Sequence, residues 1–437
     1  MKRNIRRRIV NIITNLRFSI ILLLLIAAVT MIGTVIEQEK SLDFYQNNYP
    51  ITQPVFGFLS WKVIVFFGID HLYSNVWFYS LMLLFASSLL ACTFSTQFPL
   101  LKVARTWKFL NTINQFNKLP LNISINKLLN KSRCTLSLNK KGYFVFQQKY
   151  NYYAYKGLVG RVSPIFVHFS LICILIGAVV SSFTGFVVQE VVPQGEYFHV
   201  QNLISAGNLS YTPQNLLGKV DDFRIAYNEN GSINQFFSTL SIQNSKGDLV
   251  KQDTIYVNKP LKYQGTSIYQ TDWNINGIQI SVDDIRLQLS ALPNFAGDEK
   301  SSWITSFRVG QDPLDTYFFV IRGLGGEVDV YTNDFSFLFT EKVGSSFMLK
   351  GLKIQIVKVI ASTGLQIKSD PGIPIVYIGF FFLILSTFLS YLTYSQIWLQ
   401  PIDGQTNFGG TSNRDVVNFE EEFYLLFNSS SKKEKSL

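Results

Sequence analysis

The chain has 437 residues, of which 47% are hydrophobic and only 16% are charged, and its mean hydropathy is +0.18. This composition excludes a disordered chain and is unusual for a wholly soluble protein, so we expect an integral membrane protein. The net charge of +10 would by itself fit binding to nucleic acid or to an anionic membrane surface, and the positions of the charges decide between these two.

Four apolar runs are each long enough to cross a bilayer, because about 20 helical residues cover the hydrocarbon core. They comprise residues 18–36, 76–94, 162–183 and 373–394. The first run follows a basic stretch, as in a signal peptide, but it is too long for one and no small-residue cleavage site follows it. We therefore expect four transmembrane helices.

The segments between these runs divide the charge unequally. Residues 1–17 carry six basic side chains and residues 95–161 carry twelve, and neither segment contains an acid. Residues 37–75 carry four acids and two bases, and residues 184–372 carry nineteen acids and fifteen bases. The positive-inside rule therefore predicts that both termini and the 95–161 loop face the cytosol or stroma. Topology and attraction to anionic lipid then explain the excess charge, and nucleic-acid binding is not expected.

The outer region 184–372 has the pattern of β structure. Short runs of β-branched and aromatic residues are separated by turn signals such as Gln264-Gly265, and no long helical periodicity is present. We expect a large, mainly antiparallel β domain between the third and fourth helices. The clearest runs are Phe237 to Ile242, Thr254 to Val257, Thr266 to Tyr269, Tyr317 to Ile321 and Lys353 to Val357.

The two inner segments give weaker signals. In the basic loop 95–161 we expect a small strand pair, Cys134 to Leu138 with Tyr143 to Gln148. The C-terminal tail 395–437 is polar after Trp398 and ends in a serine and lysine run, and we expect the part after Trp398 to be disordered.

Motifs for catalysis and for metal clusters are absent from the sequence. The three cysteines form no C-x-x-C or C-x-x-C-H motif, so neither thiol redox chemistry nor covalent haem attachment to this chain is expected. The three histidines belong to no hydrolase motif, and no nucleotide-binding motif is present. We therefore expect no independent catalytic activity.

His168 is the only histidine within a predicted span, about six residues and roughly 9 Å from its inner end. An ionisable side chain at that depth is costly and marks a functional site by default. Its helical neighbours are apolar, which suits an axial ligand to haem iron better than a proton relay. A histidine that bonds across a helix interface is an equally good interpretation. Arg161 and Lys156 lie near the inner end of this span and could contact haem propionates, although membrane anchoring explains both more simply.

The other candidate residues favour structural roles. His71 precedes the second span and is expected to be an interfacial, hydrogen-bonded side chain. His199 lies in the outer domain and is expected to be structural. The stretch from Lys259 to Trp273 is rich in aromatic and apolar residues, which favours core packing over a docking surface.

Several stretches along the chain resemble the ResB-like cytochrome c biogenesis proteins, in the shorter form typical of cyanobacteria and plastids. Agreement of so many stretches in this order by chance is improbable, although Val76 stands where the family often has a second tryptophan beside Trp77. The resembling stretches are Gly33-Thr34-Val35-Ile36-Glu37-Gln38, Tyr73 to Phe78, Ser88 to Phe94, Val167-His168-Phe169-Ser170 with Gly177, Val257 to Gly265, Tyr269 to Trp273, Asp370 to Pro374, Ser395 to Trp398 and Ser412-Asn413-Arg414.

This resemblance implies a subunit of a haem-delivery complex that works with a CcsA-type membrane partner. His168 would be one of two axial ligands to haem b, held between the two subunits and not covalently attached. The outer domain would hold apocytochromes c, such as cytochrome f and soluble lumenal cytochromes, near the haem. The resemblance and the organelle-like residue bias also imply a plastid thylakoid membrane, with a bacterial inner membrane as the alternative.

A function of another class stays open. The outer domain could be a membrane-tethered ligand-binding or sensing domain without haem, in which the helices only anchor the chain. A solute transporter is disfavoured, because four spans with one polar group inside the membrane make a poor pathway.

Overall fold

The computed structural model divides the chain into two compact units, Met1–Val179 with Gly372–Leu437 and Val180–Pro371. Residues 1–7 and 9 of the basic segment 1–17 and residues 432–437 at the end of the tail lie outside the residues that the structure describes. These described residues are 8, 10–126, 131–213, 216–229, 232–244, 246–294, 302–402 and 405–431.

The first unit contains four helices that are long and apolar enough to cross a membrane, which confirms that expectation. The second helix is longer than predicted: one turn of π-helix, η2 (Thr93–Gln97), joins α5 to α6, so residues 95–104 are helical and not part of a loop. Asn75 caps the start of α5, where its side chain accepts a hydrogen bond from the backbone N–H of Trp77. The helices are α2 (Leu16–Val35), α5 (Val76–Cys92) continued by α6 (Phe98–Ala104), α9 (Val159–Thr184) and α10 (Ile373–Ser390).

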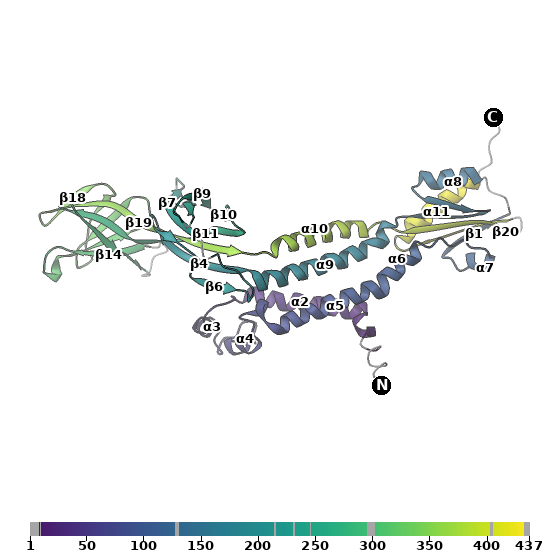
Figure 1. Ribbon diagram of the computed structural model, residues 1–437, viewed down its shortest axis with the longest axis horizontal. Coiled ribbons are helices and arrows are strands. Elements are labelled where there is room, and N and C mark those ends of the chain that lie inside the picture. The colour runs from purple at the N-terminus through teal and green to yellow at the C-terminus, as the bar shows by residue number, and fades with distance from the viewer. Residues whose placement is uncertain are drawn as a thin grey trace, which may run out of the picture. The chain divides into compact units, whose positions relative to one another are not determined.

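Small residues bring α9 and α10 together, and Figure 1 shows the two helices side by side. A Cβ atom on Gly177 would lie 2.6 Å from the Val376 side chain, and one on Gly379 would lie 2.7 Å from Ile174. Ser163 Oγ donates a hydrogen bond of 3.0 Å to the backbone carbonyl of Ser386. Close backbone approach with polar links is typical of helix pairs in membranes.

The other helix contacts join α2, α5 and α9. Leucine and phenylalanine side chains of the three helices form one cluster around Leu22, Phe85 and Leu89. The hydroxyls of Ser19 and Ser88 share a hydrogen bond of 2.7 Å between α2 and α5. Between α2 and α5 the chain forms α3 (Leu42–Asn48), α4 (Trp61–Phe67) and η1 (Leu72–Ser74).

The rest of the first unit is a five-stranded antiparallel sheet built from two distant parts of the chain, which we call the discontinuous sheet. Its strand order is β1-β21-β20-β3-β2. Helices α8 and α11 lie on one face and α7 on the other (Figure 1). The elements are β1 (Leu121–Ile125), β2 (Phe144–Gln148), β3 (Asn151–Lys156), β20 (Ser395–Ile402), β21 (Gln405–Ser412), α7 (Ile113–Phe116), α8 (Lys131–Lys140) and α11 (Val416–Ser431).

Two expectations about these segments were wrong. Cys134 to Leu138 is helical rather than a strand, because Cys134 and Leu138 lie one turn apart and both are buried against the sheet. The strand β2 pairs instead with β3. The described part of the tail forms β20, β21 and α11 and is not disordered, because Phe419 and Phe423 of α11 repeat at helical spacing and cover β21.

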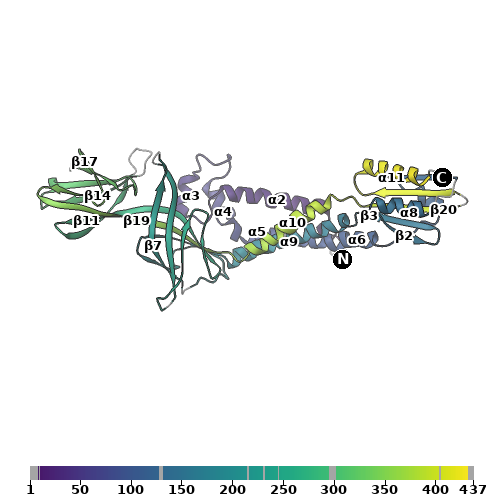
Figure 2. The same ribbon diagram turned by 90° about the horizontal axis from the view of Figure 1, so that it is seen from above.

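The second unit is rich in antiparallel β structure, as expected, and contains three sheets. Among its described residues, the only α-helical segment is the end of α9. The four-stranded sheet lies crosswise to β19 in Figure 2. The seven-stranded sheet contains β4 (Phe186–Pro193), β6 (Leu203–Ala206), β10 (Leu261–Tyr263), β11 (Thr266–Val282), β12 (Ile285–Ser290), β18 (Ser346–Leu349) and β19 (Leu352–Ser369). The four-stranded sheet contains β5 (Tyr197–Phe198), β7 (Leu217–Tyr227), β8 (Ile233–Gln243) and β9 (Leu249–Tyr256). The five-stranded sheet contains β13 (Leu292–Asn294), β14 (Ser302–Arg308), β15 (Thr316–Ile321), β16 (Glu327–Tyr331) and β17 (Phe337–Lys342).

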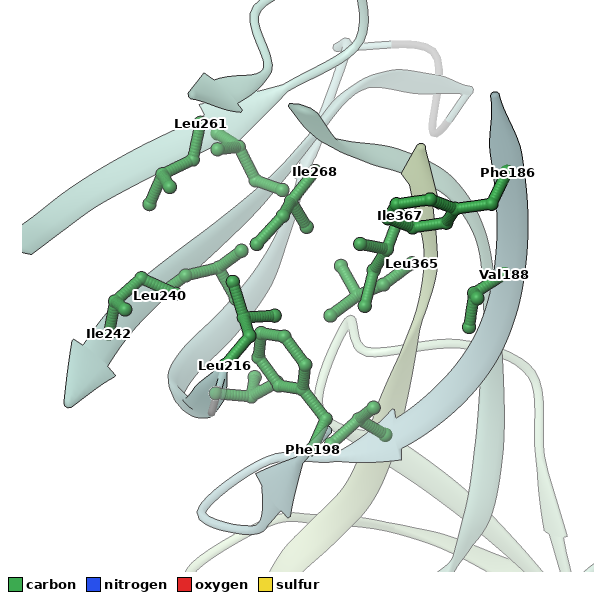
Figure 3. Close-up of a cluster of buried hydrophobic side chains, with 13 residues drawn as sticks. Phe186, Val188, Phe198, Leu216, Leu240, Ile242, Leu261, Ile268, Leu365 and Ile367 are labelled. Carbon is green, nitrogen blue, oxygen red and sulfur yellow. The ribbon is translucent and has the colours of Figure 1, made fainter. Parts of the chain in front are cut away.

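The long strands β11 and β19 belong to two hydrophobic cores. At one end they face the four-stranded sheet, and Figure 3 shows side chains of both sheets pointing toward one another, with Leu240 and Ile242 opposite Leu365 and Ile367. At the other end they face the five-stranded sheet, around buried residues such as Phe319. A bulge in β11 between Gln270 and Asp272 interrupts the pairing with β19 between these cores.

Candidate functional site

His168 lies on α9, where its half-buried imidazole contacts the second span. Its Nδ1 atom lies 2.8 Å from the hydroxyl oxygen of Thr93, the first residue of the π-helical turn. The Thr93 hydroxyl also lies 2.7 Å from the backbone carbonyl oxygen of Leu89. The interpretation of His168 as a residue that bonds across a helix interface is therefore confirmed for one ring nitrogen.

The direction of the Thr93–Leu89 hydrogen bond indicates which ring nitrogen of His168 carries the proton. The Leu89 carbonyl oxygen can only accept, so the single Thr93 hydroxyl proton is donated to it. Thr93 Oγ1 is then an acceptor, and His168 Nδ1–H must donate to it. The Nε2 atom consequently carries the free lone pair, and it makes no hydrogen bond to any described residue. An imidazole oriented through Nδ1–H, with Nε2 free, is the form that binds metal.

The wall beside His168 on α9 is apolar, as the sequence predicts. Leu171, Ile172 and Leu175 pack partly buried against the cluster around Phe85. In the part of the chain that the structure describes, no group of three or more metal-binding side chains occurs. The geometry therefore offers iron one nitrogen ligand and an apolar surface.

Arg161 and Lys156 differ in whether they are paired. The Arg161 guanidinium lies over the Tyr394 ring, 5.3 Å from its centroid, and its buried Nε atom lacks a hydrogen-bond acceptor among the described residues. Burial raises the pKa of Tyr394 well above its usual value, so this ring stays neutral and leaves the Arg161 charge uncompensated. Lys156 Nζ instead forms an ion pair of 3.2 Å with Glu422, so only Arg161 has capacity for an anion.

The two other histidines belong to other parts of the chain. His71 is exposed, and its Nδ1 atom lies 3.0 Å from Asp70 Oδ1 without hydrogen-bond geometry. His199 is exposed between β5 and β6 of the second unit. Neither is brought together with His168 by contacts within its own unit.

The comparisons with known proteins cover almost the whole chain. A model described as the ResB-like family matches residues 16–299 and 284–424. The chain belongs to the ResB-like family. A protein named cytochrome c biogenesis protein Ccs1 from Rhodomonas salina is 44% identical over 428 residues, which are 97% of this chain and 96% of the relative. The Ccs1 protein of Thalassiosira pseudonana is 43% identical over 98% of this chain and 100% of its own length. Cytochrome c biogenesis protein CcsB of Thermosynechococcus vestitus is 42% identical over 96% and 95%.

Several residues that carry the resemblance to the ResB-like family make structural contacts. Gln38 Nε2 donates to the backbone carbonyls of Gly33, Ile36 and Ile69, and its Oε1 accepts from the backbone N–H of Leu72. These bonds close the end of α2 onto the turn before α5. A Cβ atom on Gly33 would lie 2.3 Å from the Leu72 side chain, which explains the glycine.

The stretches after α10 fasten this helix to the discontinuous sheet. Asn413 Oδ1 accepts a hydrogen bond from the backbone N–H of Tyr394 at 2.9 Å, and Arg414 donates one of 2.6 Å to the carbonyl of Ser390 at the end of α10. The Trp398 indole N–H donates to the Lys108 carbonyl at 2.7 Å. These family residues therefore hold the fold together.

The stretch from Lys259 to Trp273 in the second unit also packs as expected. Gln264 and Gly265 both have positive φ and form the two-residue turn of the β10–β11 hairpin. Leu261 is buried in the core beside the four-stranded sheet, and the Trp273 ring packs against Trp303 at 5.2 Å. Core packing is confirmed for Leu261 and Trp273.

Reasoning from the sequence missed Thr93 and Leu89 as partners of His168. A signal was present, since Thr93 belongs to the resembling stretch Ser88 to Phe94 and is a polar residue in an apolar helix. The π-helical turn that begins at Thr93 could not be predicted, although such turns are frequent at functional sites.

Proposed function

We propose that this chain is a membrane subunit of the machinery that assembles c-type cytochromes, and that with a haem-handling partner it binds haem b and presents it to apocytochromes. The observation that carries the proposal is the full-length similarity to proteins named for cytochrome c biogenesis. The free Nε2 atom of His168 gives this function a chemical basis in the chain itself.

In this proposal His168 is one axial ligand to the haem iron. The Leu89–Thr93–His168 chain holds the ring in the tautomer that presents Nε2. His168 is the only histidine of the four apolar helices, so in this proposal a CcsA-type partner would supply the second histidine ligand. Arg161 lies seven residues nearer the start of α9 and binds a haem propionate through its uncompensated guanidinium.

The proposed orientation follows from the charge distribution. The basic segments 1–17 and 95–161 face the stroma, and the antiparallel domain between α9 and α10 faces the lumen of a plastid thylakoid. There this domain holds apocytochromes such as cytochrome f and soluble c-type cytochromes close to the haem. It acts by positioning, so it needs no catalytic side chains of its own. In a cyanobacterial or other bacterial membrane, the same domain would lie on the outer side of the membrane.

A haem absorption spectrum of the purified protein, with and without its partner, tests the proposal. We expect a bis-histidine spectrum in the complex, little haem on this chain alone, and loss of most of the signal in His168→Ala. The matched control is His199→Ala, which removes an exposed histidine and should leave the spectrum unchanged. A full-strength spectrum in the His168→Ala complex would remove this residue as a ligand.

The alternative function without haem has one observation in its favour, the hydrogen bond between His168 and Thr93 across two helices. If that bond is the whole role of the ring, the second unit is a tethered ligand-binding domain. The complex would then contain no haem in any variant, and cytochrome assembly in cells would survive His168→Ala.

A further inference from the structure

A pocket of about 520 Å³ lies where α6 ends and α9 begins, and the function proposed above does not use it. It is lined by Leu101, Arg105, Trp107, Tyr155, Leu158 and Val162. Its volume is in the range of small-molecule and cofactor pockets. The lining thus comprises aliphatic side chains, two aromatic rings and one cation.

Two of the lining rings, Trp107 and Tyr155, are the ends of one aromatic stack. The Trp107 ring stacks on Phe146 with centroids 4.1 Å apart and an interplanar angle of 25°, and Phe146 stacks in turn on Tyr155 at 5.8 Å and 9°. Trp107 is nevertheless 54% exposed, because Phe146 covers only one of its faces. The open face is a surface onto which another planar ring can stack.

Arg105 supplies a cation that nothing else in the described residues uses. Its backbone N–H caps α6, but its guanidinium forms neither a hydrogen bond nor an ion pair with the part of the chain that the structure describes. The whole segment 95–161 contains no acid that could neutralise it. Arginine in such a position binds carboxylates through two parallel hydrogen bonds.

A second, apolar pocket of about 290 Å³ adjoins the first, since Leu158 and Val162 line both. It reaches Phe166 of α9 and Leu389 of α10. Val162 and His168 are six residues apart, about 240° around the helix, so the two pockets and the imidazole lie on different faces of α9. The site is therefore distinct from the axial ligand.

We propose that this pocket receives haem from the inner side of the membrane, with its carboxylates on Arg105 and its ring against Trp107, before the iron is bound at His168. This role rests on the proposed function, whereas the binding site rests on the pocket alone. An exposed tryptophan ring next to an unpaired arginine matches a planar, apolar ring with acidic groups on one edge. An anionic phospholipid would satisfy Arg105 but would leave the Trp107 ring unused.

Iron-free protoporphyrin IX is the probe that separates this site from His168, because it has the same carboxylates and ring but no metal to ligate. The full-length protein is placed in phosphatidylcholine nanodiscs and porphyrin binding is followed by fluorescence. We expect saturable binding that is about tenfold weaker in Arg105→Gln, through loss of a charge-assisted hydrogen bond, and several-fold weaker in Trp107→Ala. Both side chains are exposed, so the variants should fold.

Three comparisons make the result specific. Lys102→Gln removes an exposed cation of α6 that does not line the pocket, and it should bind as the wild type does. His168→Ala should also keep full porphyrin binding. The dimethyl ester of protoporphyrin, which has no carboxylates, should bind weakly and equally to the wild type and Arg105→Gln.

Each opposite result overturns the proposal. Equal binding by Arg105→Gln and the wild type would exclude the carboxylate contact, and loss of binding in His168→Ala would place the porphyrin at the axial ligand. If phosphatidylglycerol in the nanodiscs abolishes porphyrin binding to the wild type, the pocket is a lipid site. Failure of the proposed function would look different, with porphyrin bound at Arg105 but no His168-dependent haem spectrum in the complex.

Discussion

Replacing Thr93 by valine tests whether the Leu89–Thr93–His168 chain prepares His168 for iron. The substitution keeps the side-chain shape and removes only the hydroxyl. Thr93 is 8% exposed, so water cannot replace the lost acceptor. The Nδ1–H of His168 is then left unpaired, which costs about 1–3 kcal/mol, or the proton moves to Nε2 and blocks the ligand atom.

Either consequence of Thr93→Val, the unpaired Nδ1–H or the proton on Nε2, lowers the affinity of the complex for haem. Loss of a residue that orients a metal-binding histidine typically costs about 10–100-fold in affinity, or about 1.4–2.8 kcal/mol. The assay is a haem titration of the complex with its partner, followed by absorbance, for the wild type and Thr93→Val. Thr93→Ser keeps the hydroxyl and should restore affinity to within about threefold, because one methyl group contributes less than 1 kcal/mol.

Thr387→Val is the matched control. The Thr387 hydroxyl also bonds the carbonyl oxygen four residues earlier in its helix, at 2.7 Å, but it is exposed and no cross-helix bond is recorded for it. This variant should bind haem as the wild type does. Unchanged haem affinity in Thr93→Val would refute the argument that the threonine sets the tautomer of His168.

Three further variants test the packing and the electrostatics. Gly177→Ala places a Cβ atom 2.6 Å from a valine side chain of α10, so thermal unfolding in detergent should show a loss of about 1–3 kcal/mol. Leu261→Ala opens a cavity in the core of the second unit and should cost about 2–5 kcal/mol in denaturant unfolding followed by tryptophan fluorescence. The Tyr49 hydroxyl donates a hydrogen bond to Glu37 and holds the pKa of this carboxyl below its ordinary value of 4.5. Tyr49→Phe should therefore destabilise the protein near neutral pH, and melting curves should show the difference fading as the pH falls through the lowered pKa.

The controls follow from the same contacts. Gly325→Ala is the control for Gly177→Ala. It adds a methyl group where no atom lies within 4 Å, so it should leave the melting temperature unchanged. Lys262→Ala changes an exposed neighbour of Leu261 and should cost little. If Tyr49→Phe lowered stability equally at pH 7 and well below the pKa of Glu37, the hydrogen bond to the carboxylate would not be the cause.

The four apolar helices could be predicted because about 20 consecutive apolar residues are enough to indicate each one. The same holds for the hairpin turn at Gln264-Gly265, where two neighbouring residues determine the geometry. The discontinuous sheet could not be predicted, because its central pairing joins Tyr153 to Trp398 across most of the chain. Neither segment alone buries enough apolar surface to indicate a domain.

Only one of the two side chains at the candidate site could be identified from the sequence. His168 is conspicuous as the only histidine in an apolar helix. Its partner Thr93 is 75 positions earlier and is brought within 2.8 Å only by the packing of α5 against α9. The proton position on the imidazole depends on this contact, so composition and spacing could not provide it.

The discontinuous sheet also sets an order for biosynthesis. The strand β3 is complete at Lys156, but the neighbour that covers its edge, β20, starts at Ser395 and emerges from the ribosome well over 200 residues later. Until then one edge of the β2–β3 hairpin is open to any passing strand. At about 5–20 residues per second, this vulnerable period lasts roughly 10–50 seconds. A nascent chain truncated before Ser395 would therefore aggregate through an edge that the finished protein never exposes.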